Sequence, residues 1–581
     1  MPDQKLDNLL NLALSATEQE REKSGNLNVG YDQELRLWDV LVKYNGDTSG
    51  LEGPGVFAVP LLGDYAVVTL PESELETYAR RPQIEFVEIP KRLFFADYAA
   101  NQASCITSLQ TGRSGRGGTD NLTGKGILIG IVDSGVDYWH PDFRNPDGTT
   151  RILRLWDQEI SGNPPAGYVL GTEYTKEQID LALILPEREG RELVPSQDLS
   201  RHGTAVLGIA AGNGRASEGM NRGVAFESEL VVVKLGRPRE NSFPRTTELI
   251  QGLDYLVRMS RELGRPMAIN LSFGNNYGSH RGDSLVETYI DNVSDIGRLV
   301  LCTGTGNNGS DALHTGGKLS SGERTEVEFG VGAYETTLNV QLWKDYEDEI
   351  EIYVENPAGE RIGPLYEELG AQRYRLGNTE LLIYYGKPAP YHVTQEIYFD
   401  FLPTRSFVDS GVWKVILQGK QVKSGEYFLW MPGGNVLNPG TNFYLPRAQG
   451  TLTIPSTSGK IISVGAYDSA RNSYADFSGR GSDFLPRRKP DLAAPGVNIT
   501  APVPGGRYDT VTGTSFATPF VTGAAALLME WGIVRGNDPF LYGEKVKAYL
   551  RRGAKPLPGY GEYPNAEVGW GTLCVGDSIP D

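Results

Sequence analysis

The chain has 581 residues, which is more than one typical domain needs and suggests about three or four domains. Its 73 Asp and Glu residues outnumber its 55 Lys and Arg residues, and the resulting net charge of −18 argues against nucleic acid as a partner, because phosphate binding needs clustered cations. No uninterrupted apolar run approaches the roughly 18 residues that a membrane-spanning helix requires, so we expect no membrane insertion.

The amino-terminal stretch MPDQKLDNLLNLALSATEQEREK predicts an amphipathic helix. Asp3 and Asp7 are acidic, and Asn8 and Asn11 interrupt the leucines, which is not typical of a secretory signal peptide. We therefore expect a protein without a signal peptide, although export by another route or by cell lysis stays open.

The three cysteines lie far apart and predict neither a disulfide framework nor a metal cluster. We expect Cys105, Cys302 and Cys574 to be free, buried thiols in a reducing compartment.

Residues 1–102 predict a small α+β unit. Strands are expected at Trp38–Tyr44, Asp64–Leu70 and Ile84–Ile89, with a helix at Glu72–Arg80. The polar, glycine-rich stretch that follows, ANQASCITSLQTGRSGRGGTDNLTG, is typical of an exposed linker.

From Gly124 onward, short apolar runs alternate with helical stretches. The runs GILIGIVD, LVVVKL, PMAINLSFG, RLVLCTGTG and KIISVGAY are apolar on both faces, as strands of a covered parallel sheet are. Helices are expected between them at Thr204–Gly212, Thr247–Leu263 and Leu285–Ile296. The pattern predicts a doubly wound α/β domain.

Between residues 311 and 451 the apolar period changes to two. Runs such as TTLNVQLW, EIEIYVEN and WKVILQG, separated by turn residues, predict an antiparallel β-sandwich inserted between residues 103–310 and 452–581 of the α/β domain. The acidic run DYEDEIEIY within the insert admits a metal site, but its alternation with apolar residues favours a solvated strand face.

Ser515, in VTGTSFATP, stands at the start of an apolar helix expected from about Ser515 to about Trp531. Pro519 fits only the first turn of such a helix. The positive end of the helix dipole favours negative charge, which suits a nucleophile. It suits an ordinary helix cap equally well.

Two further residues complete a possible catalytic set. His202 opens a small-residue helix in SRHGTAVLGIAAG, where Gly203 permits close approach of another chain segment. Asp133 ends the strand GILIGIVD, at the edge where open α/β sheets bind ligands. Taken singly, the histidine can be structural and the aspartate a turn or cap residue.

The segments VDSG around Asp133, HGT around His202 and GTSFATP around Ser515 resemble, in order and local sequence, the subtilisin-like serine proteases. The resemblance covers about Gly124–Ser310 and Leu452–Asp581. It implies a subtilisin-like fold and a serine endopeptidase in which Ser515 attacks, His202 is the general base and acid, and Asp133 orients the imidazole.

The same resemblance implies the rest of the site. Asn307, in LVLCTGTGNNG, matches the family's oxyanion asparagine, although a loop turn is the alternative. Thr453 falls near the floor of the primary specificity pocket, where many relatives have glycine, and predicts a shallower and more polar pocket. The walls of that pocket are matched by two segments, Ser272, Phe273 and Gly274, and Gly304, Thr305 and Gly306.

His140 and Asp142, in DYWHPDF, match a turn in which the family's aspartate can bind calcium. The loop that usually completes this site is not recognisable after His202, so we expect no metal and no cofactor. The remaining histidines, which lack motifs, are expected in loops or on the surface; they are His280, His314 and His392.

Residues 1–102 resemble a subtilase prodomain, an intramolecular chaperone and inhibitor, with cleavage expected within Ala96–Ser104. Together with the triad and the insert, they resemble the Csp germination proteases of clostridial spores. That resemblance implies a jelly-roll-like insert, a prodomain that stays bound after cleavage, a spore or cytoplasmic location, and a cortex-lytic zymogen as substrate.

Two alternatives stay open beside this germination protease. One is a general intracellular or lysis-released peptidase. The other is a latent scaffold that binds or senses a partner, as subtilase pseudoproteases do. The expected partners are a protein or peptide substrate and the chain's own prodomain.

Overall fold

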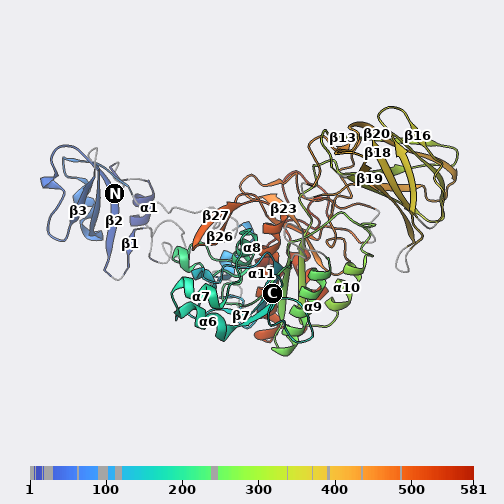
Figure 1. The fold of residues 1–581 in the computed structure, drawn as a ribbon. Helices are drawn as coiled ribbons and strands as arrows, with labels where there is room; N and C mark the ends of the chain where they lie inside the picture. The colour runs from blue at the N-terminus through green and yellow to red at the C-terminus, as the bar shows by residue number, and fades with distance from the viewer. Residues whose placement is uncertain are drawn as a thin grey trace. The chain divides into compact units, whose positions relative to one another are not determined.

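The computed structural model describes residues 5–6, 8–15, 18, 30–33, 35–61, 65–88, 103–110, 121–236 and 246–580, apart from 337, 369–370, 389–392, 434–435 and 484–486. The chain divides into two compact units, Met1–Phe94 and Phe95–Asp581 (Figure 1).

The first unit is an antiparallel sheet of order β1-β2-β4-β3, with β5 paired to β2. Trp38, Val40 and Val42 alternate along β2 into a core that also holds Leu10 of α1 and Tyr78 of α3, so the predicted α+β unit is confirmed. The expected helix at Glu72–Arg80 is split between η2 and α3. The elements are α1 (Asn8–Ser15), β1 (Tyr31–Asp32), β2 (Leu37–Tyr44), η1 (Thr48–Gly50), β3 (Phe57–Leu61), β4 (Tyr65–Pro71), η2 (Glu72–Glu74), α3 (Leu75–Ala79) and β5 (Ile84–Glu88).

The second unit is built on a sheet of order β24-β23-β11-β10-β6-β9-β7-β8, with β25 paired to β23. All five predicted strands are present and neighbour one another in parallel, which confirms the doubly wound class. Strands β8 and β24 run antiparallel at the edges. The strands are β6 (Leu128–Asp133), β7 (Ile152–Asp157), β8 (Thr172–Thr175), β9 (Glu229–Lys234), β10 (Met267–Leu271), β11 (Leu299–Gly304), β23 (Ile462–Asp468), β24 (Ser473–Tyr474) and β25 (Leu492–Pro495).

Helices cover both faces of this sheet. Ile129 and Ile131 of β6 pack with α8 and α11, whereas Leu128 and Val132 pack with α9 and α10. The strand is therefore apolar on both faces because both faces are buried. The helices are α5 (Thr107–Gln110), η3 (Pro141–Phe143), α6 (Lys176–Ile184), α7 (Glu187–Leu193), α8 (His202–Ala211), η4 (Arg215–Ser217), α9 (Thr246–Glu262), α10 (Leu285–Ser294), α11 (Thr514–Met529), α12 (Gly543–Gly553) and α13 (Val575–Ser578).

Helix α11 continues into a π-helical turn, η5 (Glu530–Val534). Over Thr514–Val534 this is the one helix of the described residues that is long and apolar enough to cross a membrane, with a mean hydropathy of 1.3. The sequence search for unbroken apolar runs missed it, because Thr and Gly residues interrupt the run without making the helix polar. Since 89% of its most apolar window is buried inside the protein, it has the environment of a core helix.

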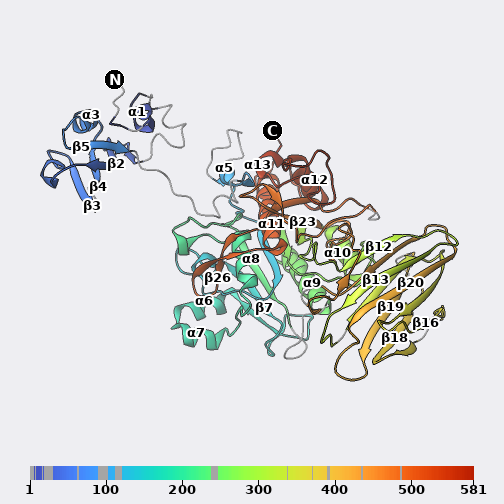
Figure 2. The same cartoon turned by 90° about the horizontal axis from the view of Figure 1, so that it is seen from above.

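The insert consists of two antiparallel sheets, of order β12-β21-β14-β19-β18-β17 and β16-β15-β20-β13-β22, that enclose a shared apolar core (yellow to orange in Figure 2). Along β15 exposed or half-buried residues alternate with buried ones, so Glu349 and Glu351 of the acidic run form a solvated strand face as expected. Asp348 of the same run is buried instead, and its carboxylate accepts hydrogen bonds from three backbone N–H groups of residues 423–425. The strands are β12 (His314–Lys318), β13 (Arg324–Val331), β14 (Leu338–Asp345), β15 (Glu349–Glu355), β16 (Arg361–Ile362), β17 (Ala371–Leu376), β18 (Thr379–Tyr385), β19 (Thr394–Pro403), β20 (Gly411–Gln421), β21 (Glu426–Trp430) and β22 (Asn442–Phe443), followed after β25 by the hairpin β26 (Ile499–Val503) and β27 (Arg507–Val511).

Two of the three cysteines form a disulfide, Cys105–Cys574, so the expectation of three free thiols is wrong. The backbone N–H of Val575 donates to the Ser104 carbonyl at 3.0 Å, which brings the segment at 103–110 beside α13. The 469 residues that separate the cysteines conceal this proximity in the sequence. Cys302 is free and buried, as expected.

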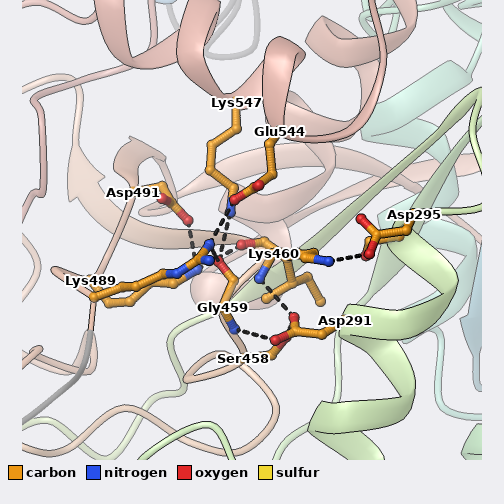
Figure 3. A network of polar contacts seen from close by, with 12 residues as sticks. Asp291, Asp295, Ser458, Gly459, Lys460, Lys489, Asp491, Glu544 and Lys547 are labelled. Carbon is orange, nitrogen blue, oxygen red and sulfur yellow. Dashed lines mark hydrogen bonds and ion pairs between the residues drawn. The ribbon is translucent and has the colours of Figure 1, made fainter.

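A buried ionic network lies at the amino-terminal ends of strands β23 and β25 (Figure 3). The carboxylate of Asp491 accepts hydrogen bonds from Lys489 Nζ at 2.9 Å and from Arg551 of α12. Lys547 Nζ donates to the Gly459 carbonyl at 2.9 Å, and burial, followed by the charge of Lys489, lowers the pKa of Lys547 to about 7. The network ties α12 to the segments that enter β23 and β25.

Candidate active site

Asp133 and His202 are in direct contact. Asp133 ends β6 and is fully buried, and its Oδ1 lies 2.7 Å from His202 Nδ1 at the start of α8. The approach depends on Gly203, since a Cβ there would lie 2.2 Å from the Gly135 carbonyl oxygen and 3.0 Å from Asp133 Oδ1. The HGT and VDSG motifs therefore meet through a contact that only glycine permits.

The aspartate controls the titration of the imidazole. Burial of the ring favours its neutral form, but the charge of Asp133 and its hydrogen bond outweigh burial and raise the pKa of His202 above 6.5. The His202 side chain is 28% exposed, so the ring edge opposite Asp133 can reach a substrate. This is the geometry of an imidazole held in one tautomer by a carboxylate.

Ser515 is the second residue of α11, and Gly513 holds the N-cap position, so the alternative that Ser515 caps the helix is wrong. The Ser515 hydroxyl donates to the Ser272 carbonyl at a long 3.4 Å. Among the described residues no hydrogen bond joins Ser515 to His202, although the His202 ring lies 5.2 Å from that of Phe516. Catalytic hydrogen bonds are often long or misaligned in a site without substrate.

Asn307 follows β11 and is fixed by the start of α11. Its Oδ1 accepts from the Thr514 N–H at 2.9 Å and from the Thr514 hydroxyl at 3.0 Å. Because a backbone N–H faces Oδ1, the Nδ2 group must point the other way. The amide oxygen is therefore bound to the start of α11 and not to its own loop, and Asn307 and Ser515 border one cavity.

That cavity has a volume of about 710 Å³ and is lined by Ser272, Phe273, Gly274, Gly304, Gly306, Asn307, Thr453 and Ser515 among others. Thr305 is not among them: its side chain is fully buried and bonds Ser478 Oγ at 3.1 Å. Five of the six residues of the two predicted wall segments therefore line the cavity, and Thr305 is the exception.

Thr453 fills the space between the two wall segments. A Cβ on Gly274 would lie 2.4 Å from Thr453 Oγ1, and a Cβ on Gly306 would lie 2.4 Å from Thr453 Cγ2. The Thr453 N–H donates to the Thr305 carbonyl at 3.0 Å, which fixes it between the walls. A threonine wedged there leaves less depth than a glycine would.

The sequence did not predict that the insert reaches this cavity. Asp311 and Gly433 of the insert line it, together with Asn276 and Asn308 of the α/β domain. Asn276 and Gly433 are more than 150 residues apart, and no motif marks either.

The calcium that the family can bind at Asp142 does not fit the residues present. Asp142 is fully buried, and its Oδ1 accepts from the Ala216 N–H at 2.9 Å while its Oδ2 accepts from the Tyr508 hydroxyl at 2.7 Å. Each carboxylate oxygen therefore already has a protein donor, and among the described residues no group of three or more His, Cys, Asp or Glu side chains could complete a site for a cation.

Two of the three histidines without motifs are buried. His280 lies in a loop, as expected, whereas His314 opens strand β12, so the expectation of a loop or surface position is wrong for His314. His280 and His314 both stack on Trp430, with ring centroids 4.3 and 4.4 Å away. The sequence around each histidine gives no sign of this, because Trp430 is distant in the chain. His392 lies outside the described residues.

Comparison with known families follows the same division of the chain. Residues 4–91 match the model of the Csp protease B prodomain, and residues 124–380 and 417–571 match that of the subtilase family. The chain is a subtilase. The structure of the Clostridium perfringens CspB protease is 36% identical to this subtilase, covers 83% of it and 96% of the CspB chain, and superposes with a TM-score of 0.75. The expected resemblance to the Csp proteases is therefore confirmed.

Curated relatives are matched over less of their length. The subtilase is 33% identical to the serine protease AprX of Bacillus subtilis (strain 168) over 150 residues, 22% of this chain and 32% of AprX. It is 25% identical to the minor extracellular protease Vpr of the same strain over 485 residues, 79% of this chain and 52% of Vpr. The chain thus spans about a third of the length of AprX and about half of the length of Vpr.

Proposed function

We propose that this subtilase is a self-processing serine endopeptidase. The observation that carries the proposal is the 2.7 Å contact between His202 Nδ1 and the buried Asp133, with Ser515 at the amino end of the adjacent helix α11. A buried carboxylate beside Nδ1 orients the imidazole so that its other nitrogen can accept and return a proton.

In the proposed reaction, neutral His202 takes the proton from Ser515 Oγ while Oγ attacks the carbonyl carbon of the peptide bond. The oxygen that becomes negative accepts hydrogen bonds from Asn307 Nδ2 and the Ser515 N–H. His202 then gives its proton to the leaving amine, and a water molecule, deprotonated by His202, releases the acyl group. Asp133 stabilises the imidazolium at both steps.

Protein segments with a small residue before the cut bond are the proposed substrate class. Thr453 occupies the space between Gly274 and Gly306 at the floor of the cavity beside Ser515, which disfavours large aromatic side chains. The first substrate is the chain's own linker within 96–104, of which residues 96–102 lie outside the described residues. The second proposed substrate is a spore cortex-lytic zymogen, which the resemblance to the Csp proteases supports.

One observation favours a different function. Ser515 Oγ donates to the Ser272 carbonyl and not to His202, as it would in a latent scaffold that binds a partner without cutting it.

A fluorophosphonate probe separates the two functions, because it reacts only with a serine that a neighbouring base activates. We expect stoichiometric labelling of Ser515, located by peptide mass mapping, and none in His202→Ala. Absence of labelling in the purified wild-type protein, with the chain still whole, would favour the latent scaffold.

A further inference from the structure

The loop that follows the first pocket wall is held by the insert. Strand β10 ends at Leu271, the wall follows as residues 272–274, and the loop runs to the start of α10 at Leu285. Asn275 pairs with Ile454 through two backbone hydrogen bonds of 2.9 and 3.0 Å. Beyond this pair, the loop is fixed chiefly by groups that belong to the insert.

Gln341 of β14 makes the most specific of these contacts. Its side chain is buried, its Oε1 accepts from the Gly278 N–H at 3.0 Å, and its Nε2 donates to the Asn276 carbonyl at 3.4 Å. One insert side chain therefore satisfies a donor and an acceptor of the protease backbone within four residues of the wall. A buried amide used in this way fixes position, because shifting the loop would leave the Gly278 N–H unpaired and would leave the Asn276 carbonyl only its 3.3 Å contact with His280 Nε2.

The insert backbone also lies directly against the loop. Asn276 Nδ2 donates to the Met431 carbonyl at 3.2 Å. A Cβ on Gly433 would lie 3.0 Å from Asn276 Nδ2 and 2.6 Å from Asn308 Oδ1, so no side chain fits there. Asn276, Asn308 and Gly433 all line the cavity beside Ser515.

A stack of rings closes the same junction. His280 of the loop lies parallel to Trp430 of β21, at an interplanar angle of 10°, and His280 Nδ1 lies 2.7 Å from the Leu452 carbonyl oxygen. Trp430 Nε1 donates to the Gly450 carbonyl at 3.1 Å. The loop, the last long strand of the insert and the segment that returns to Thr453 are thus joined in one place.

We propose that Gln341 is a positioning residue for the substrate, and that the insert is part of the substrate-binding edge. The proposal rests on the proposed protease function. An extended peptide that pairs with the wall as an added strand needs the wall's backbone groups in register. Gln341 holds the loop, which continues through Asn275 into the wall. Among the described residues no hydrogen bond joins the insert to Asp133, His202 or Ser515, and Ser515 meets the wall only at Ser272, through bonds of 3.2 and 3.4 Å.

The test compares Gln341→Ala with Gln395→Ala in the processed full chain. Gln395 is the matched control: it is a buried glutamine of β19, but its Nε2 donates to the Gly386 carbonyl at 2.8 Å, inside the insert. Two rates are measured for each variant. One is labelling by a small fluorophosphonate, which needs only the activated Ser515, and the other is cleavage of a quenched fluorescent peptide with the sequence of residues 93–104, LFFADYAANQAS.

We expect Gln341→Ala to raise KM for the peptide by roughly tenfold, with kcat and the labelling rate within about twofold of the wild type. Gln395→Ala should leave all three unchanged. Equal effects of the two variants, or a loss of labelling that matches the loss of cleavage in Gln341→Ala, would overturn the positioning role while leaving the protease function intact. A wild-type protein that neither labels nor cuts would overturn both.

Discussion

Asn307 Oδ1 lies 2.9 Å from the backbone nitrogen of Thr514, a residue 207 positions later in the chain. The contact joins the end of β11 to the first turn of α11, beside Ser515. It turns the amide nitrogen of Asn307 away from Thr514, and Asn307 lines the same cavity as Ser515.

Asn307→Ala should lower kcat by about 10²–10³-fold and change KM little, because the lost hydrogen bond forms only when the carbonyl oxygen becomes negative. Steady-state kinetics on the linker peptide test this. Thr514→Ser, which keeps both donors to Oδ1, serves as the control and should stay near the wild type. A kcat of Asn307→Ala within threefold of the wild type would exclude the oxyanion role.

Activity should fall as the pH drops through the pKa of His202, which lies above 6.5. The neutral ring is the base, and a raised pKa keeps the ring protonated to higher pH. The contribution of the His202–Asp133 ion pair to the stability of the folded protein has the opposite pH dependence. It is fully present below pH 6.5 and is lost as the pH rises through the pKa of His202 in the folded state.

The dependence of kcat/KM on pH, measured on the linker peptide, gives the pKa of the free enzyme. In Asp133→Asn we expect the acidic limb to move to lower pH and kcat to fall by roughly 10⁴-fold. An acidic limb below 6.5 in the wild type would contradict the electrostatic coupling between these two residues.

Thr453→Gly should deepen the specificity pocket. A library of peptides varied at the residue before the cut bond should show small residues preferred by the wild type, and a gain of about tenfold or more for phenylalanine in the variant. The reason is the removal of the hydroxyl and methyl groups that stand 2.4 Å from where wall Cβ atoms would lie. A wild-type profile dominated by phenylalanine and tyrosine would show that Thr453 does not limit the pocket.

The Cys105–Cys574 disulfide should stabilise the processed enzyme by about 2–4 kcal/mol relative to Cys574→Ser. Denaturant unfolding measures the difference, and Cys302→Ser, which removes the buried free thiol, controls for the loss of a cysteine. Alkylation of the unfolded, unreduced protein should modify one cysteine. Modification of all three would show that the bond is absent from the purified protein.

The parallel core could be predicted from the sequence because β6, β9, β10, β11 and β23 are buried on both faces. Each of these strands is therefore a short, continuous apolar run that can be recognised without knowing its neighbours. Asp133, His202 and Ser515 could be named because each stands in a short motif at an element boundary. These features depend on residues within a few positions of one another.

The features that escaped prediction depend on contacts between distant segments. Tyr508 donates a hydrogen bond to Asp142, Cys574 forms a disulfide with Cys105, and Gln341 accepts a hydrogen bond from the Gly278 N–H. None of these residues has an unusual local sequence. Their partners depend on how the insert and the carboxyl-terminal segments pack. The periodicity of apolar residues along the sequence does not predict that packing.

The measurement that tests the proposed function most directly is the intact mass, with a denaturing gel, of the purified wild type beside Ser515→Ala. We expect the wild type to separate into fragments of roughly 11 and 52 kDa, the shares of the 63.5 kDa chain on either side of residue 102, while the variant stays whole. The disulfide does not join the fragments, because both of its cysteines follow the cut. A wild type that stays whole, or a variant that splits as the wild type does, would contradict self-processing by Ser515.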